Sequence, residues 1–207
     1  MDHASAQRFT EVCERVGLAP ERAHSNWDDL RQRYSEEHRS YHNLSHIDRM
    51  LSWLDASSAG TDAIELAIWF HDVIYEPLGS HNEAKSAQHF VDHLGSFIGG
   101  SLVEDVERLI RATDPTRSRS GMPDEDMIID IDLSILGSPP DQYEVYRSAV
   151  RREYSSVAEA DFIAGRKSIL QSFLSQRIYS TEFFAQLEQQ ARSNIKNEFE
   201  CLEPAKS

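Results

Sequence analysis

Apolar residues recur along this chain with the three- and four-residue spacing of amphipathic helices. No stretch alternates apolar and polar residues with turn residues at hairpin spacing, so the sequence predicts an all-α fold. The one strand-like run, 128–133, contains residue types that buried helices also contain. The apolar positions of the expected helices are Phe9, Val12, Val16; Trp27, Leu30, Tyr34; Leu44, Ile47, Leu51, Leu54; Ala84, Ala87, Phe90, Leu94; Leu102, Val106, Leu109; Tyr143, Tyr146, Val150; Phe162, Ile169, Phe173; and Phe184, Leu187, Ala191, Ile195.

Residues typical of helix N-termini mark several boundaries. Ser25 or Asn26 is expected to cap the second helix, and Asn43 the third. Asp141 begins a capping box before the helix near 143–150, and Thr181 is expected to cap the last helix. Residues 77–80 and 114–123 are expected to form a turn and a loop, because both contain proline and glycine.

The stretch 62–76 is the most apolar part of the chain. Asp62 and Glu65 have the spacing of a capping box at its start. A helix that is apolar on every side is a buried one. An unpaired carboxylate is costly in a dry interior, so Asp72, next to His71, needs an arginine, a set of N–H donors or a metal ion as partner. A core histidine with one hydrogen bond is the commoner outcome for an isolated His-Asp pair. One face carries Ile64, Ala67, Ile68 and His71, and the others carry Leu66, Phe70, Val73 and Ile74.

Composition limits the class of protein. The 207 residues are 40% hydrophobic, which is enough for the core of one ordinary domain. We expect a single domain over 1–207, with its core near 27–200, an N-terminal helix and turn at 1–26 and a flexible tail at 201–207. The net charge of −14 argues against binding of a nucleic-acid polymer but allows a small anionic substrate. Cys13 and Cys201 have no zinc-site or disulfide spacing.

The chain shows no apolar leader segment and no run of membrane-spanning length. A cytoplasmic protein without membrane contacts is therefore expected, and a homodimer is allowed.

Two further residues could join the His-Asp pair. His46 lies on the preceding expected helix, and a short loop at about 55–61 would let two antiparallel helices face each other. If the run near Asp132 is helical, Asp132 is centred in an apolar face, whereas Asp130 has a mixed face. Two imidazoles and two carboxylates would leave open positions on a divalent transition metal such as Mn, Fe, Co, Ni or Zn.

The ordered set His46, His71-Asp72 and Asp132 resembles the H…HD…D pattern of the HD superfamily of metal-dependent phosphohydrolases. The finer resemblance is to an uncharacterised branch that opens with Tyr-His-Asn-x-x-His, and it covers about residues 27–200. The matching segments are Tyr41-His42-Asn43-Leu44-Ser45-His46, Trp69-Phe70-His71-Asp72-Val73-Ile74-Tyr75, Asn82-Glu83 with Ser86-Ala87, Asp130-x-Asp132-Leu133 with Leu136-Gly137, Val150-Arg151 with Glu153-Tyr154, and Gly165-Arg166.

The resemblance implies an all-helical, HD-domain-like bundle that holds a metal through His46, His71, Asp72 and Asp132. Characterised nucleotidases of the superfamily place an acid four residues after the histidine, where this chain has Tyr75. Glu76 and Glu83 are therefore rivals for the general acid or base, with Asp72 as a further catalytic candidate, and we favour Glu83. One metal is expected, because Asp114-Pro115 follows Ala112-Thr113 where the branch often has a histidine.

Substrate contacts are expected from the same motifs. Arg151 and Arg166 could bind phosphate, or form salt bridges in an acidic protein. His42 lies four residues before His46 and could pair with it as a helical metal ligand; if Asn43 is the cap, His42 lies outside the helix and could instead contact phosphate or belong to the cap. Asn82 lies in a matching motif. Tyr154 could stack on a base or lie in the core. His81, His89 and His93 share one amphipathic helix and are expected at the surface.

The sequence therefore indicates a phosphohydrolase that acts on a nucleotide or another small phosphate ester. Three alternatives stay open. The first is a lyase or oxygenase on an HD-like scaffold. The second is a non-catalytic sensor module that binds a nucleotide or a metal, and the third is structural burial of these groups.

Overall fold

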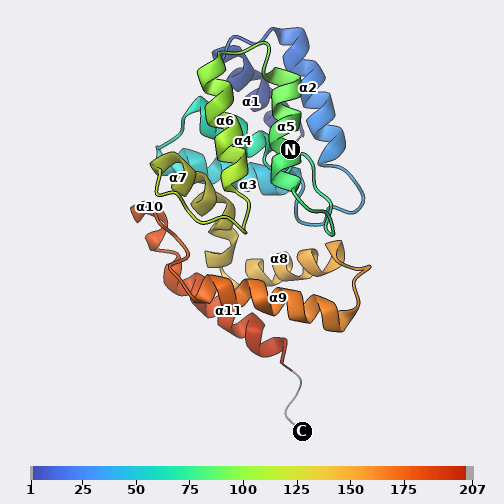
Figure 1. Cartoon of the computed structure of the whole chain (residues 1–207), viewed down its shortest axis with the longest axis vertical. Coiled ribbons are helices and arrows are strands. Elements are labelled where there is room, and N and C mark those ends of the chain that lie inside the picture. The colour runs from blue at the N-terminus through green and yellow to red at the C-terminus, as the bar shows by residue number, and fades with distance from the viewer. Residues whose placement is uncertain (1, 204–207) are drawn as a thin grey trace. The chain divides into compact units, whose positions relative to one another are not determined.

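The computed structural model describes residues 2–203 and confirms the all-α prediction, with no strand in that range. Figure 1 shows the helices in chain order. None of the helices in the described range has both the length and the apolar character of a membrane span. The helices are α1 (Asp2–Arg15), α2 (Pro20–Arg33), α3 (Leu44–Ser57), α4 (Asp62–Phe70), α5 (Asn82–Leu94), α6 (Gly100–Ala112), α7 (Pro123–Asp132), the 3-10 helix η1 (Leu133–Gly137), α8 (Pro140–Glu153), α9 (Glu159–Leu174), α10 (Glu182–Ala185) and α11 (Glu188–Cys201).

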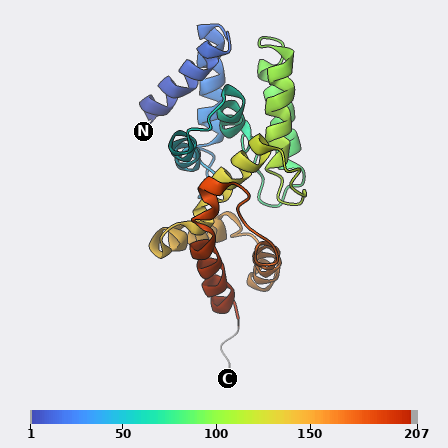
Figure 2. The ribbon, with the colours of Figure 1, turned by 90° about the vertical axis from the view of Figure 1, so that its left-hand side faces the viewer.

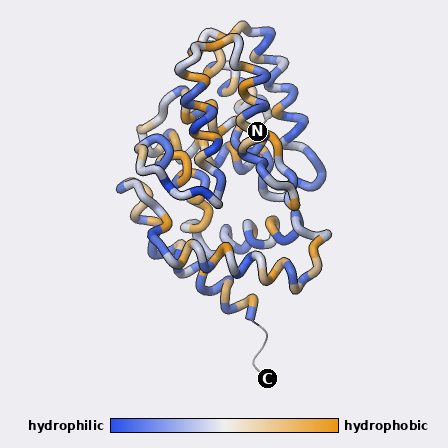
Figure 3. Tube along the Cα trace, in the orientation of Figure 1, coloured by the Kyte–Doolittle hydropathy of each residue, from blue (hydrophilic) through white to orange (hydrophobic). Residues whose placement is uncertain are grey.

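The chain groups into two compact units, Met1–Ile128 and Ile129–Ser207, and the division falls within α7. The single domain expected over residues 1–207 stays a prediction. Of the tail expected at 201–207, Cys201 is the last residue of α11, and residues 204–207 lie outside the described range. Most helices of both units carry both apolar and polar residues, as amphipathic helices do (Figure 3).

Helix α4 is the core helix of the first unit. Every residue from Ala63 to Phe70 is buried, as its uniformly apolar sequence predicts. The helix packs against α1, α3, α5 and α6, and α5 and α6 lie side by side (Figure 1). Aromatic rings fill the space around it with edge-on contacts, such as Trp69 against Phe9 and Trp27 at 5.5 and 5.9 Å between ring centroids.

The start of α4 differs from the prediction. Thr61, not Asp62, is the N-cap, and its hydroxyl accepts a hydrogen bond from the Ile64 N–H at 3.2 Å. The capping box with Glu65 is therefore wrong. The Glu65 carboxylate instead binds Arg8 at 2.8 Å and Arg15, both on α1. A buried carboxylate takes charged partners in preference to a backbone N–H, and these partners are remote in sequence.

Two other helices also begin at residues that differ from the prediction. Helix α2 begins at Pro20 and not at Ser25 or Asn26, and α8 begins at Pro140 and not at Asp141. Proline is favoured in the first turn of a helix, where its missing N–H has no partner to lose. The cap predicted at Asn43 is confirmed, since its side-chain oxygen accepts a backbone N–H. Thr181 also caps a helix through its hydroxyl, but that helix is the short α10; the last helix, α11, begins separately after Leu187, which makes no side-chain cap.

In the second unit, Glu198 of α11 joins two other helices. Its carboxylate accepts a hydrogen bond from the Tyr143 hydroxyl of α8 at 2.5 Å and a two-pronged one from Arg166 of α9 at 2.7 and 3.0 Å. Figure 2 shows α11 between α8 and α9. Gly137 of η1 allows α11 to begin close by, because a Cβ there would lie 2.6 Å from that of Leu187.

Candidate metal centre

His46 reaches the candidate site from the first turn of α3. The Asn43 side chain accepts the Ser45 N–H at 3.0 Å and fixes where the helix begins. His46 then lies on the buried side of α3 with Ile47, and only 2% of the residue is exposed. The α3 N-terminus predicted from the sequence therefore places this imidazole inside the first unit.

His71 and Asp72 follow directly after the buried helix α4, and both are buried. The His46 Nε2 atom lies 3.2 Å from the His71 Nε2 atom. The Asp72 Oδ2 atom lies 3.1 Å from the Nε2 of His71 and 3.9 Å from the Nε2 of His46. Two imidazole nitrogens and one carboxylate oxygen therefore converge on one point, as expected for these three residues.

A second hydrogen bond decides which nitrogen of His71 can bind a metal. The Nδ1 atom lies 2.9 Å from the carbonyl oxygen of Ile68, one turn back along α4. A carbonyl oxygen only accepts, so Nδ1 carries the hydrogen. In the neutral imidazole this leaves a lone pair on Nε2, the atom that faces His46 and Asp72. Metal-binding histidines in proteins are held in the same way.

The Asp72 carboxylate stays ionised in this buried place. Burial acts to raise its pKa, but the facing imidazoles of His71, His42 and His46 outweigh burial and hold the pKa well below its usual range. A carboxylate surrounded by imidazole nitrogens has the composition of a divalent transition-metal site.

The spacing of these atoms fits a metal ion. Nitrogen and carboxylate ligands lie about 2.0–2.2 Å from zinc, which separates neighbouring ligand atoms by roughly 3–3.5 Å. The distances of 3.1 and 3.2 Å around His71 fall in this range, and the 3.9 Å between His46 and Asp72 is a little longer. The three residues could hold one metal ion with positions left for further ligands.

Sequence reasoning missed Arg39, which holds the site together. Its guanidinium is buried and donates to the carbonyl oxygens of Asp72 at 2.7 Å, Val73 at 3.1 Å and His42 at 3.1 Å. Glu36 pairs with the Nε of this arginine at 2.9 Å. Arg39 thus ties the turn that carries Asp72 to the segment that leads into α3. Its position next to the Tyr-His-Asn segment was the only signal in the sequence.

The two aspartates of α7 correct one step of the sequence argument. Asp130, expected on a mixed face, is 0% exposed, and its carboxylate accepts the Ser180 N–H at 3.1 Å and the Thr181 N–H at 2.7 Å. These donors come from a loop fifty residues away, which no helical pattern reveals. Asp132 is half-buried and is the last residue of α7, since the chain continues as the 3-10 helix η1. Asp132 belongs to the second unit, and its role as the fourth ligand stays a prediction.

Of the two rival glutamates, Glu83 has the perturbed environment. Burial raises the pKa of its carboxyl, with the charges of Asp114 and Asp72 adding to the rise. Glu83 lies in the first turn of α5 and is half-buried, whereas Glu76 is exposed. A carboxyl with a raised pKa near a candidate site is a good candidate for proton transfer.

The residues expected to touch substrate in the first unit have local structural partners. The Asn82 side chain accepts the Glu76 N–H at 3.4 Å and donates to its carbonyl oxygen at 3.0 Å, which closes the loop before α5. The His42 ring stacks on Tyr75 with centroids 4.1 Å apart. His42 precedes the helix, so it does not form a helical ligand pair with His46.

In the second unit, the predicted phosphate ligands are engaged in ion pairs. Arg166 forms the buried pair with Glu198 described above, and Arg151 binds Glu159 at 2.8 Å and the carbonyl oxygen of Tyr154 at 2.7 Å. The Tyr154 ring lies 6.0 Å from that of Phe162. These contacts give the arginines structural partners and supply no support for phosphate binding.

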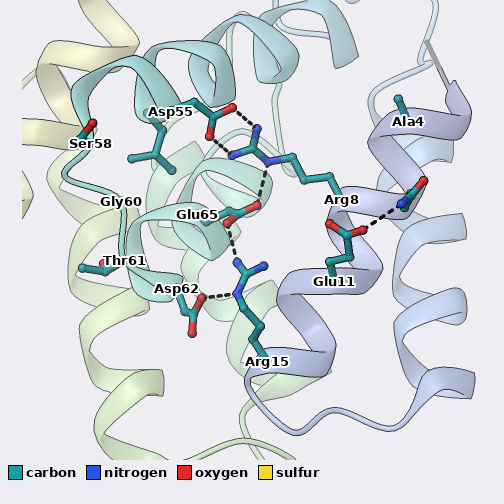
Figure 4. A pocket seen from close by; sticks show the side chains of 12 residues that line it. Ala4, Arg8, Glu11, Arg15, Asp55, Ser58, Gly60, Thr61, Asp62 and Glu65 are labelled. Carbon is teal, nitrogen blue, oxygen red and sulfur yellow. Dashed lines mark hydrogen bonds and ion pairs between the residues drawn. The ribbon is translucent and has the colours of Figure 1, made fainter.

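The cavity in Figure 4, about 720 Å³ in volume, lies elsewhere, between α1, α3 and α4. Its two arginines are paired with carboxylates, Arg8 with Asp55 and Glu65 and Arg15 with Asp62 and Glu65, and Glu11 accepts a hydrogen bond from Gln7. No histidine lines it. An ion-pair network between helices therefore lines this cavity. The candidate metal site lies at His46, His71 and Asp72.

No family model matches the sequence, and neither the curated proteins nor the solved structures contain a match.

Proposed function

We propose that this protein is a metal-dependent phosphohydrolase of the HD type that acts on a nucleotide or another small phosphate ester. One observation carries the proposal, namely the convergence of the Nε2 atoms of His46 and His71 and the Oδ2 atom of Asp72 within 3.9 Å of one another. The order of these residues along the chain, which resembles the HD pattern, supports the same class of reaction.

In this proposal His46, His71 and Asp72 hold one divalent transition metal, with Asp132 as the fourth ligand. The bound metal would acidify a water molecule and polarise a phosphoryl oxygen. Arg39 positions the site, because it fixes the backbone on both sides of Asp72 without reaching the ligand atoms itself. The Nδ1 hydrogen bond of His71 keeps its Nε2 available.

Glu83 is the proposed general acid or base. Its raised pKa keeps more of the carboxyl protonated near neutral pH than in an exposed glutamate. A raised pKa brings a carboxyl closer to the working pH, where a group can both give and take a proton during turnover. Asp72 and His71 are among the charges that act on the Glu83 carboxyl, which supports its placement near the reacting atoms.

Arg49 is the proposed cation for the phosphate, in place of Arg151 and Arg166. It lies three residues after His46 on α3, and residues with this spacing share one face of a helix. Its Nη1 atom is buried and has no hydrogen-bond partner among the described residues. A buried N–H without an acceptor is costly, and a phosphate oxygen would satisfy it.

The test is phosphate release from a panel of nucleotides and simple phosphate esters, with Mn²⁺, Co²⁺ or Ni²⁺ added to chelator-treated protein. We expect turnover that a chelator abolishes and that His71→Ala lacks. Arg49→Gln should raise KM about tenfold or more while the metal content is unchanged, since a charge-assisted hydrogen bond contributes about 1.5–3 kcal/mol. Full turnover in metal-free protein would overturn the proposal. Metal and nucleotide binding without turnover would identify a sensor module instead.

A further inference from the structure

The helix α5 carries two histidines that the proposed phosphohydrolase does not use. His89 and His93 are four residues apart, so they lie on the same face of the helix, one turn from each other. Their rings are stacked with centroids 4.0 Å apart. Both residues are half-buried, which corrects the expectation that they are ordinary surface histidines.

An aspartate from another helix completes the group. The Asp29 Oδ2 atom of α2 lies 2.7 Å from the His89 Nε2 atom. One ligand atom from each of Asp29, His89 and His93 lies within 4.8 Å of the other two. We propose that these three residues form a second metal site, of the class that takes Zn²⁺, Ni²⁺ or Cu²⁺, and that the bound ion ties α2 to α5.

A hydrogen bond alone explains only part of this arrangement. It accounts for the short contact between Asp29 and His89, but not for a second imidazole donor brought to the same place. Two imidazoles at helical spacing and one carboxylate form a three-ligand set that leaves one position for water. Imidazole ligands favour zinc, copper and nickel over magnesium or calcium.

The surroundings of Asp29 suit a ligand. Arg33, one turn along α2, binds the same carboxylate with its Nε at 3.0 and 3.2 Å from the two oxygens. Carboxylate ligands in metal sites are held by hydrogen bonds of this kind, which fix their orientation. Asp29 also borders a surface hollow of about 760 Å³, which is lined by Asp28, Asp29, Arg31, Gln32 and Ser35.

A bound ion would bring the three ligand atoms, now within 4.8 Å of one another, to a common spacing. Ligand atoms of a tetrahedral zinc site lie about 3.3 Å apart, so the 2.7 Å contact would open by about 0.6 Å. Asp29 and His89 are sixty residues apart in the sequence, so the ion would act as a staple between the two helices.

The test uses full-length protein in which the first site is disabled by His71→Ala, titrated with Co²⁺ and Zn²⁺. We expect one equivalent of metal to remain, with Co²⁺ giving the visible absorption bands of a tetrahedral or five-coordinate ion. Adding His93→Ala should weaken this binding at least tenfold and remove the absorption. His24→Ala is the control, because His24 is exposed and bonds only to its own helix.

Thermal unfolding gives a second readout that does not depend on activity. Zn²⁺ should raise the Tm of the His71→Ala protein, and the rise should disappear in the His71→Ala/His93→Ala variant while the metal-free Tm of the two stays similar. Absence of metal binding in folded His71→Ala protein would overturn this inference and leave the phosphohydrolase proposal intact. Unchanged binding in the His93→Ala variant would also overturn it.

Discussion

The histidine at position 71 becomes a candidate ligand through one hydrogen bond. Its Nδ1–H donates to the carbonyl oxygen of Ile68. The Nε2 atom, which then carries the lone pair of the neutral ring, faces His46 and Asp72. The sequence predicted that His71 is buried beside Asp72, because the whole stretch is apolar. It could not predict the tautomer, because the tautomer depends on where α4 ends. The helix ends at Phe70, and the ring of His71 therefore reaches a carbonyl oxygen of the last turn.

The pH dependence of turnover is expected to report Glu83. If Glu83 acts as the base, kcat should fall on the acid side at a pH above the usual glutamate range, because burial and the charges of Asp114 and Asp72 raise its pKa. Glu83→Gln should remove this limb of the pH profile and lower kcat about 10²- to 10⁴-fold. Glu76→Gln is the matched control, since Glu76 is exposed, and its profile should equal that of the wild type.

The same shift has a consequence for stability. The pKa of Glu83 is higher in the folded than in the unfolded chain, so the folded state binds more protons between the two values. Stability therefore falls as the pH rises through that window, and Glu83→Gln removes this loss. On going from pH 4 to pH 7, urea unfolding of metal-free protein should show a change in the free energy of unfolding that favours the folded state more in the variant than in the wild type; an equal change would contradict the raised pKa.

At the scale of elements, helix ends place the candidate ligands. The sequence predicted the N-cap of α3 at Asn43 and the burial of α4, because both follow from local patterns. It did not predict Arg39 or the arginine partners of Glu65. The contacts of Arg8 and Arg15 with Glu65 and of Arg39 with Asp72 join residues 33 or more positions apart, so the periodicity of a single helix does not reveal them.

Arg39 is expected to be needed for the shape of the site. Arg39→Lys keeps the charge but has a single ammonium group, which cannot donate to the carbonyls of His42, Asp72 and Val73 in the fork that the guanidinium makes. Metal affinity should fall about 10- to 100-fold, as for other residues that orient ligands. Arg31→Lys, an exposed arginine on α2, is the control. Unchanged affinity in Arg39→Lys would remove Arg39 from the site.

The end of α7 separates two aspartates that the sequence argument treated by pattern alone. Asp130→Asn should lower the free energy of unfolding by about 1–3 kcal/mol, because the buried carboxylate accepts the N–H groups of Ser180 and Thr181 and the hydroxyl of Thr181. Its metal content should stay that of the wild type. Asp132→Asn should keep the fold and lose metal affinity. The reverse outcome, with metal lost only in Asp130→Asn, would show that Asp130 is the fourth ligand.

At the scale of the whole molecule, the helical class was predictable and the division of the chain was not. Helix-period spacing extends through the entire sequence, so the all-α fold follows from residue pattern alone. The boundary at Ile128 falls inside α7, where the sequence has no linker composition to mark it. In the second unit, Glu198 and Asn194 of α11 form hydrogen bonds with partners 32 to 58 residues away.

The central claim is that His46, His71 and Asp72 hold a metal ion, and the most direct measurement is the number of Mn²⁺ or Co²⁺ equivalents bound by purified, chelator-treated protein. We predict that His71→Ala binds one equivalent fewer than the wild type, with affinity at this site reduced more than about a hundredfold, because even residues that only orient ligands contribute 10- to 100-fold. The control variant His24→Ala, which changes an exposed histidine, should bind as many metal equivalents as the wild type. Equal metal binding by folded His71→Ala and wild-type protein would contradict the account.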